Sequence, residues 1–216
     1  ENTFVSGMSN GGFMSYTLAC EQSGTFKAIA SVTGTMSGYD WENCNPDYKI
    51  PILQISGTND NTVPMDGSMS TVWGWGGAPK IEDIIDYWSN INSCSSSEII
   101  NLPNNDSADN SYVTLDKRFT SESKDEVRFY TVHGGGHDWP GAWGNMDINA
   151  SEEIWNFLKK YTIFPGDVNQ DTIINILDII YLIEIILSGD LDNNTADINN
   201  DGQINVIDVV SLVNLI

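Results

Sequence analysis

The chain has 216 residues, of which 30 are Asp or Glu and 9 are Lys or Arg, so its formal net charge is −21. This length allows one domain of ordinary size plus a small one, and 40% hydrophobic residues argue against global disorder. The negative charge argues against nucleic acid or an anionic membrane surface as a partner. It favours a neutral or cationic ligand, or bound cations.

The apolar stretches are too short to cross a membrane. The longest, 173–187, is interrupted by Asn175, Asp178 and Glu184 and is shorter than the ~18 residues that a spanning helix needs. No signal peptide is recognisable. Because the chain begins with Glu1 and opens almost directly into an apolar run, we expect a fragment, and this absence then says nothing about export.

Residues 1–161 alternate between strand and helix patterns. The predicted strands are 3–5, 28–32, 50–55 and 127–132, with a further candidate at 112–115 in the polar stretch 101–126. The predicted helices are one from Gly12, one from Ile81 to Ile91, and one capped by Ser151, with Glu152 and Glu153 in its first turn and Lys159 and Lys160 in its last. This alternation favours an α/β fold in which helices cover a mostly parallel sheet.

The composition changes near Pro165. Residues 162–166 are typical of a domain boundary, so we predict two domains, 1–161 and 162–216. After Lys160 there is no Lys or Arg, whereas nine acidic residues lie between Asp167 and Asp208. Within this tail, 167–178 aligns with 197–208, and each copy precedes an apolar helix, predicted at 179–187 and 209–216.

Three cysteines, Cys20, Cys44 and Cys94, lack the CxxC spacing of a zinc site. The odd number fits one disulfide plus a cysteine whose partner lies outside the fragment. Three reduced, buried thiols fit equally well.

A G-x-S-x-G motif occupies Gly7 to Gly11. Between a strand and a helix, this pattern makes a sharp turn that holds the serine in strained dihedrals and presents its hydroxyl above the sheet. Ser9 is then a candidate nucleophile, and the backbone N–H of Asn10 a candidate oxyanion donor. The alternative is an ordinary Gly-Ser loop between core elements.

A nucleophilic serine needs a general base, and the base needs a carboxylate to orient it. His137 lies in a glycine-rich loop after a strand and is favoured over His133, which ends the strand and can be structural. Asp60 follows a buried strand, and the order Ser9, Asp60, His137 is that of the α/β-hydrolase triad. The alternative carboxylates are Asp66, Asp83 and Asp138.

Three segments, Val5–Gly12, Ile55–Pro64 and Gly134–Gly141, resemble the signatures of the polyhydroxybutyrate depolymerase/feruloyl esterase family, and 147–151 is similar too. The resemblance covers about residues 1–160. It implies the C-terminal part of an α/β-hydrolase whose N-terminal strands are missing, with Ser9 as nucleophile, Asp60 as acid and His137 as base. Catalysis would need no cofactor. Because the family's second oxyanion donor precedes the serine turn, we expect residues 1–216 alone to be inactive.

The two acidic loops have the ligand spacing of EF-hand calcium loops. The expected ligands are Asp167, Asn169, Asp171, the carbonyl of Ile173, Asn175 and Asp178 in the first loop, and Asp197, Asn199, Asp201, the carbonyl of Gln203, Asn205 and Asp208 in the second. Two such loop–helix units resemble a type I dockerin, a small all-α domain that takes two Ca²⁺. Thr172 stands where the second loop has Gly202, which predicts a weaker first site.

The dockerin resemblance implies a cohesin-like protein partner. The pairs Ile176-Leu177 and Val206-Ile207 stand where cellulosomal dockerins have Ser and Thr, so a surface- or secretion-linked partner, or intramolecular packing, is as well supported. Four tryptophans in glycine-rich loops could form a stacking platform for an aromatic acyl group or a sugar, or simply anchor their loops. These are Trp73, Trp75, Trp139 and Trp143.

Together these patterns predict a secreted serine esterase with a calcium-dependent interaction module. Its substrates would be polyhydroxyalkanoate-type polyesters, or feruloyl or acetyl esters of plant polysaccharide. The rival hypothesis is a non-catalytic fragment that acts as a calcium-dependent protein-binding module.

Overall fold

The computed structural model describes residues 2–69, 76–171, 173–189 and 195–216. These residues form two compact units, Asn2–Tyr161 and Thr162–Ile216. The first unit is a mixed α/β structure, and the second is helical.

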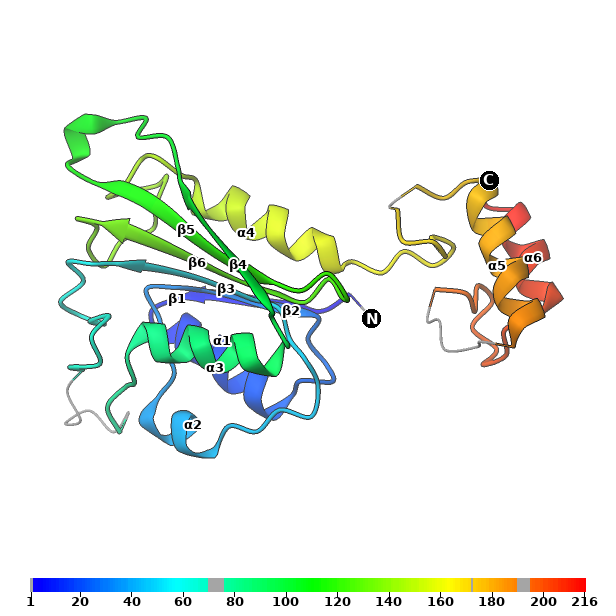
Figure 1. The fold of residues 1–216 in the computed structure, drawn as a ribbon, viewed down its shortest axis with the longest axis horizontal. Coiled ribbons are helices and arrows are strands. Elements are labelled where there is room, and N and C mark those ends of the chain that lie inside the picture. Colours follow the sequence, from blue (N-terminus) through cyan, green and yellow to red (C-terminus); the bar gives the residue numbers. More distant parts are fainter. Residues whose placement is uncertain (1, 70–75, 172, 190–194) are drawn as a thin grey trace. The chain divides into compact units, whose positions relative to one another are not determined.

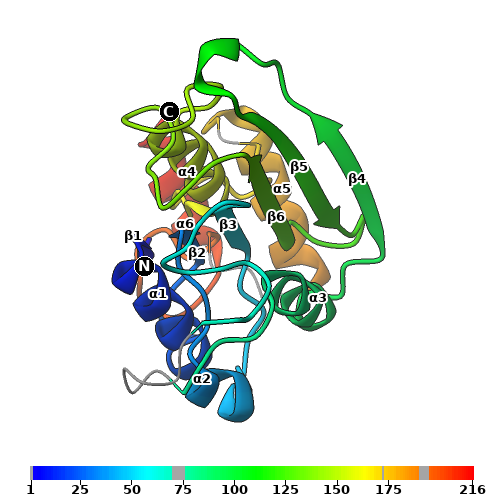
Figure 2. The same cartoon turned by 90° about the vertical axis from the view of Figure 1, so that its left-hand side faces the viewer.

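The first unit is built on a six-stranded sheet with the order β1-β2-β3-β6-β5-β4, which Figure 2 shows strand by strand. The strands are β1 (Phe4–Met8), β2 (Ala28–Val32), β3 (Ile52–Gly57), β4 (Ser96–Asn101), β5 (Tyr112–Phe119) and β6 (Glu126–His133). β1, β2, β3 and β6 are parallel, whereas β5 pairs antiparallel with both β6 and β4. The four parallel strands therefore end at one edge of the sheet, the carboxyl edge, and the predicted mostly parallel sheet is confirmed.

Helices cover both faces of this sheet (Figure 1). They are α1 (Asn10–Glu21), α2 (Gly38–Asn43), α3 (Ile81–Ile91) and α4 (Ala150–Leu158). Successive residues of β3 point to opposite faces: Leu53 and Ile55 join the core beneath α4, and Ile52 joins the core beneath α1 and α3. β2 and β3 are buried along their whole length, as expected of central strands with both faces covered.

Local sequence signals misplaced several elements. β4 was not predicted because its residues are polar and mostly exposed at the edge of the sheet, and the six-residue α2 was missed as well. Ser151 is not the cap of α4. Asn149 is, because its side chain accepts the backbone N–H groups of Ser151 and Glu152.

One disulfide joins Cys20, in the last turn of α1, to Cys44, which directly follows α2. Cys94 is a free thiol. In the described parts of the chain, no helix is both long and apolar enough to cross a membrane.

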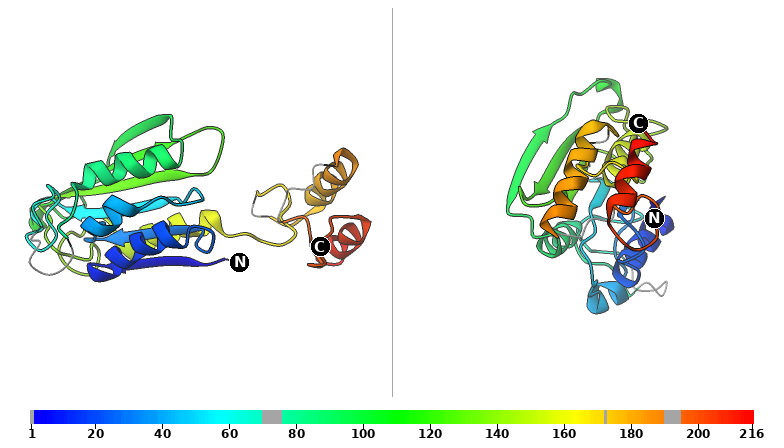
Figure 3. Two further views of the ribbon diagram at one scale, coloured as in Figure 1. Left: turned by 90° about the horizontal axis from the view of Figure 1, so that it is seen from below. Right: turned by 90° about the vertical axis from the view of Figure 1, so that its right-hand side faces the viewer.

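The second unit contains α5 (Ile176–Ser188) and α6 (Val206–Val213), which lie side by side (Figure 3). Both helices begin three residues before their predicted starts because Asn175 and Asn205 cap them: each side chain accepts a backbone N–H two residues later. Leu182 and Ile185 of α5 and Leu212 of α6 form the core with Val168 and Ala196.

Candidate functional site

Ser9 sits in the sharp turn between β1 and α1, with φ 52° and ψ −116°. Its backbone N–H donates to the carbonyl of Val32 on the neighbouring strand at 2.9 Å. A non-glycine residue in this region costs about 1–3 kcal/mol, so the surrounding packing must hold it there. Asn10 begins α1, and its N–H therefore has no carbonyl acceptor within the helix.

Glycine is needed on one side of this turn. A Cβ on Gly7 would lie 2.6 Å from the backbone of Gly11, whereas a Cβ on Gly11 would meet nothing within 4 Å. Gly12 and Gly34 are also in close approach, since a Cβ on Gly12 would lie 2.9 Å from Cα of Gly34. The turn is thus pressed between its own helix and the loop that follows β2.

A buried glutamine ties the same region together, and the sequence analysis missed it. Gln54 of β3 accepts the hydroxyl of Tyr16 on α1 at 2.9 Å and donates to the carbonyl of Gly34 at 2.9 Å and to Ser56 Oγ at 2.8 Å. Burial raises the pKa of Tyr16 far above its usual value, so this hydroxyl remains a donor. These bonds fix α1 against the sheet directly behind the serine turn.

Asp60 and His137 lie in direct contact at the carboxyl edge. His137 Nδ1 and Asp60 Oδ2 are 2.7 Å apart. The Asp60 side chain is 1% exposed and that of His137 is 24% exposed. The other carboxylate oxygen of Asp60 accepts the backbone N–H groups of Thr62 and Val63, each at 2.8 Å. Asp60 is therefore held on both oxygens, and the contact leaves Nε2 as the ring nitrogen of His137 available for proton transfer.

The other histidine has different neighbours. Nε2 of His133 meets Thr114 Oγ1 at 2.9 Å, and its ring stacks on Tyr112 with the centroids 4.3 Å apart. The alternative carboxylates are also engaged elsewhere or remote: Asp66 accepts the N–H of Ser68, Asp138 accepts the N–H of Gly136, and Asp83 is exposed on α3.

Ser9 follows β1 and His137 follows β6, so both lie at the carboxyl edge with β2 and β3 between their strands. No hydrogen bond between them occurs in the described part of the chain. A Cβ on Gly57, which ends β3, would lie 2.4 Å from the carbonyl of Gly135, so the His137 loop is pressed against the strand that leads to Asp60. A serine turn, a paired histidine and a buried carboxylate can together support nucleophilic acyl transfer.

The tryptophans fall into different environments. Trp139 packs against the core beneath α4 and donates its indole N–H to Ser151 Oγ at 3.1 Å, as an anchoring residue does. Trp143 is 52% exposed. Trp73 and Trp75 lie outside the described residues.

The described residues of the two acidic loops share a backbone feature. Gln170 and Asn200 have matching positive φ values of 58° and 56°, which the sequence did not predict. Gly202 has φ 81°, as its loop position requires, and Thr172 lies outside the described residues.

The last acidic residue of each loop is fully buried. Asp178 accepts the backbone N–H groups of Asn169 and Asn175, and Asp208 accepts those of Ile198, Asn199 and Asn205. Both side chains are 0% exposed, and no Lys or Arg occurs after Lys160. Buried carboxylates with only neutral donors fit a site for a hard cation. Among the described residues, however, no three His, Cys, Asp or Glu side chains converge closely enough to hold a metal ion.

Comparison with known domain families decides the nature of this unit. A model of the dockerin type I domain matches residues 165–216. Residues 165–216 are a dockerin type I domain. The dockerin domain thus comprises both acidic loops and both helices, α5 and α6.

The chain is also similar to parts of three fungal esterases. Feruloyl esterase C of Emericella nidulans is 41% identical over 68 residues, which are 31% of this chain and 24% of that protein. The probable feruloyl esterase C of Aspergillus terreus is 42% identical over 67 residues, 31% of this chain and 23% of that protein. Feruloyl esterase B of Piromyces equi is 25% identical over 166 residues, 74% of this chain and 27% of that protein. The chain spans about a quarter of the length of these relatives.

Proposed function

We propose that residues 2–161 belong to a secreted serine esterase of the α/β-hydrolase fold, in which Ser9 is the nucleophile, His137 the general base and Asp60 its orienting carboxylate. The observation that carries the proposal is the 2.7 Å contact between His137 Nδ1 and the buried Asp60. It is the contact that a serine nucleophile's base requires. The strained turn at Ser9 and the names of the three esterase relatives support the same reaction.

The reaction follows from these roles. Ser9 Oγ attacks the ester carbonyl carbon while its proton passes to His137 Nε2, and the Asn10 N–H stabilises the oxyanion. The alcohol leaves with that proton, and an acyl-enzyme remains. A water molecule then gives a proton to His137 and attacks the acyl carbon, which releases the acid and restores the Ser9 hydroxyl.

The ester that fits the relatives' names is a feruloyl ester, such as those attached to plant polysaccharide. Acetyl esters of polysaccharide and hydroxyalkanoate polyesters are the competing substrates. Activity is tested on the full-length protein that contains this chain, with methyl ferulate, p-nitrophenyl acetate and polyhydroxybutyrate as substrates.

Ser9→Ala is the decisive variant. We expect kcat to fall by about 10³-fold or more, whereas Ser6→Ala, which removes an exposed serine of β1, should retain activity. Full activity of Ser9→Ala would assign the nucleophile elsewhere. Absence of hydrolysis by the wild-type protein would favour a purely protein-binding role.

We also propose that the dockerin domain binds two Ca²⁺ and a cohesin-type protein. Type I dockerin domains generally bind calcium, and the side chains of Asp167, Asn169, Asp171 and Asp178 would hold one ion, those of Asp197, Asn199, Asp201 and Asp208 the other. Carbonyls of Ile173 and Gln203, with Asn175 and Asn205, would complete the two sites. When bound, the cations would offset the negative charge of the loops. Titration of the full-length protein with Ca²⁺, followed by calorimetry, tests the stoichiometry.

A further inference from the structure

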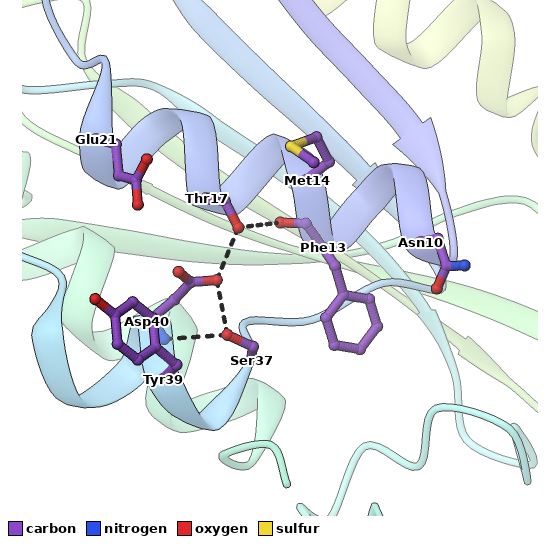
Figure 4. Close-up of a pocket in the computed structure, with 8 residues that line it drawn as sticks. All are labelled: Asn10, Phe13, Met14, Thr17, Glu21, Ser37, Tyr39 and Asp40. Carbon is purple, nitrogen blue, oxygen red and sulfur yellow. Dashed lines mark hydrogen bonds between the residues drawn. The ribbon is translucent and has the colours of Figure 1, made fainter. Parts of the chain in front are cut away.

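A cavity of about 390 Å³ begins at Asn10, the residue that follows Ser9, and runs along one side of α1. Its volume lies within the range of small-molecule sites. Its lining residues are Asn10, Phe13, Met14, Thr17 and Glu21 of α1, and Ser37, Tyr39 and Asp40 at the start of α2. Figure 4 shows Asp40 linked by hydrogen bonds to Thr17 and Ser37, with Asn10 at the other end of α1 from Glu21.

The two walls of this cavity are tied together. The disulfide between Cys20 and Cys44 links the last turn of α1 to the residue after α2. Thr17 Oγ1 of α1 donates to Asp40 Oδ2 of α2 at 2.8 Å. A site with fixed walls loses little entropy when a ligand enters.

Asp40 contributes a carboxylate to the wall of the cavity. The residue is 6% exposed. Its Oδ2 accepts the hydroxyls of Thr17 and Ser37, at 2.8 and 2.9 Å. Capping of the short helix α2 accounts for the contact with Ser37. Within the described residues, Oδ1 accepts no hydrogen bond from the protein, and it is not among the fully buried side-chain atoms that lack a partner. This oxygen therefore keeps some contact with solvent and can accept a donor from a ligand.

The spacing along α1 defines what could occupy this cavity. Asn10 and Thr17 are seven residues apart, which is about 10 Å of helix rise. Phe13, Met14 and Tyr39 give the space between them an apolar wall. A flat apolar group whose carbonyl lies at Ser9 and whose hydroxyl reaches Asp40 matches this arrangement, with the hydroxyl donating to Asp40 Oδ1.

We propose that this cavity binds the acyl part of the ester, and that Asp40 Oδ1 accepts a hydrogen bond from a phenolic hydroxyl at the far end of that acyl group. This inference rests on the proposed esterase function. Asp40 would then determine specificity by favouring hydroxylated aromatic acyl groups over the same groups without the hydroxyl, since only the former donate a hydrogen bond to the carboxylate oxygen that the ligand shields from solvent.

The test uses the full-length protein with Ser9→Ala, so that bound ester is not consumed. Calorimetry compares methyl 4-hydroxycinnamate with methyl cinnamate, which differs only in lacking the hydroxyl. We expect the hydroxylated ester to bind about tenfold more tightly or better. Adding Asp40→Asn should abolish most of that preference, because an amide that keeps its oxygen on Thr17 and Ser37 turns its N–H₂ toward the ligand hydroxyl.

Asp47→Asn, which neutralises an exposed carboxylate in the segment between Cys44 and β3, is the control and should keep the preference for the hydroxylated ester.

Thermal melting checks that Asp40→Asn folds. Should it not, Tyr39→Ala replaces it: Tyr39 is 67% exposed, and its loss should weaken binding of both esters. Equal affinities for the two esters, or an undiminished preference in Asp40→Asn, would overturn the inference. The esterase proposal is tested separately, by hydrolysis of the esters by the wild-type protein. Binding of an ester to the Ser9→Ala variant does not require turnover, so the two tests can fail independently.

Discussion

Ser9 and Thr33 occupy corresponding positions at the ends of two neighbouring parallel strands, and both have a positive φ, of 52° and 47°. The register pairs Met8 of β1 with Val32 of β2, directly before them. Positive φ is rare outside glycine and a clear outlier for a β-branched residue such as threonine. Two strained residues therefore lie next to each other at the edge that carries His137, and the closely packed glycines Gly7, Gly12 and Gly34 keep them there.

This strain predicts that two substitutions at Ser9 differ in their effect on stability. Ser9→Gly should be more stable to urea than Ser9→Ala by about 1 kcal/mol, because glycine adopts positive φ without the Cβ penalty. Both variants should be inactive. Thr33→Gly, compared with Thr33→Ala, should show the same difference. Equal unfolding free energies within each pair would mean that the backbone relaxes and stores no strain.

Asp60 has two separable roles, one on each oxygen. Asp60→Asn can keep the bonds from Thr62 and Val63 but turns an amide N–H₂ toward His137, which then takes the wrong tautomer. We expect kcat/KM to fall by about 10⁴-fold with little loss of stability. Asp60→Ala should lose the same activity and additionally about 1–2 kcal/mol of stability. Kinetics with p-nitrophenyl acetate and urea unfolding measure the two effects. Near-normal turnover by Asp60→Asn would remove Asp60 from the mechanism.

Two buried tyrosines, Tyr16 and Tyr130, and the partly buried Tyr161 make stability depend on alkaline pH. Burial is the main cause that raises the pKa values of Tyr16, Tyr130 and Tyr161 above the usual value. Above pH about 10 the unfolded chain releases tyrosine protons that the folded chain retains. The folded state then binds more protons, so stability falls as pH rises.

We therefore expect the urea midpoint to hold steady below pH about 10 and to drop beyond it. Tyr161→Phe should reduce the drop, and Tyr48→Phe, at an exposed ring, serves as the control. A midpoint that stays constant between pH 9 and pH 11 (a range set by the free tyrosine pKa of about 10) would argue against this assignment.

Glu126 gathers three of the nine basic side chains. Its carboxylate contacts Lys160, Arg128 at 3.1 Å and Lys117 at 4.0 Å, and the residue is 3% exposed. Glu126→Gln keeps the shape but leaves three cations together, so we expect a loss of about 3 kcal/mol in urea unfolding. Glu122→Gln, at an exposed position, should change stability little. If Glu126→Gln lowered the free energy of unfolding by no more than Glu122→Gln does, solvent would be screening the charges of this cluster.

The sequence predicted those features that depend on local pattern. α3 was predicted residue for residue because Ile81, Ile84, Ile85 and Trp88 mark one buried face. The serine turn was also recognisable, since G-x-S-x-G encodes its sterics locally. The buried network around Gln54 was not, because a glutamine in a strand gives no sign of which distant groups it will meet.

Tertiary contacts decided the rest of the candidate site. Chain order suggested pairing Asp60 with His137, but the separation of 77 residues meant that only the fold could bring them to 2.7 Å. The positive φ of Thr33 contradicts its intrinsic preference and results from packing at the strand end. Asp40 went unnoticed because it lies in a short helix that the sequence did not predict.

The dockerin domain should depend on calcium for its fold. Nine acidic residues and no basic residue lie between Asp167 and Ile216, and two Ca²⁺ would change that charge from −9 to −5. α5 and α6 have 13 and 8 residues, at or below the length at which an isolated helix persists in water. They are stabilised by the shared core around Leu182 and Leu212, which can form only when the two acidic loops are held together.

Removing calcium from the full-length protein with EDTA should therefore unfold the dockerin domain, because metal-binding free energy becomes folding free energy. Circular dichroism should show helix loss that Ca²⁺ restores, and calorimetry should give two sites. The site with Gly202 is expected to be the tighter one, so Asp201→Asn should weaken the high-affinity phase and Asp171→Asn the low-affinity phase. Unchanged helicity in EDTA, or fewer than one bound ion, would contradict calcium-dependent folding. Tighter binding at the first loop would contradict only the ranking.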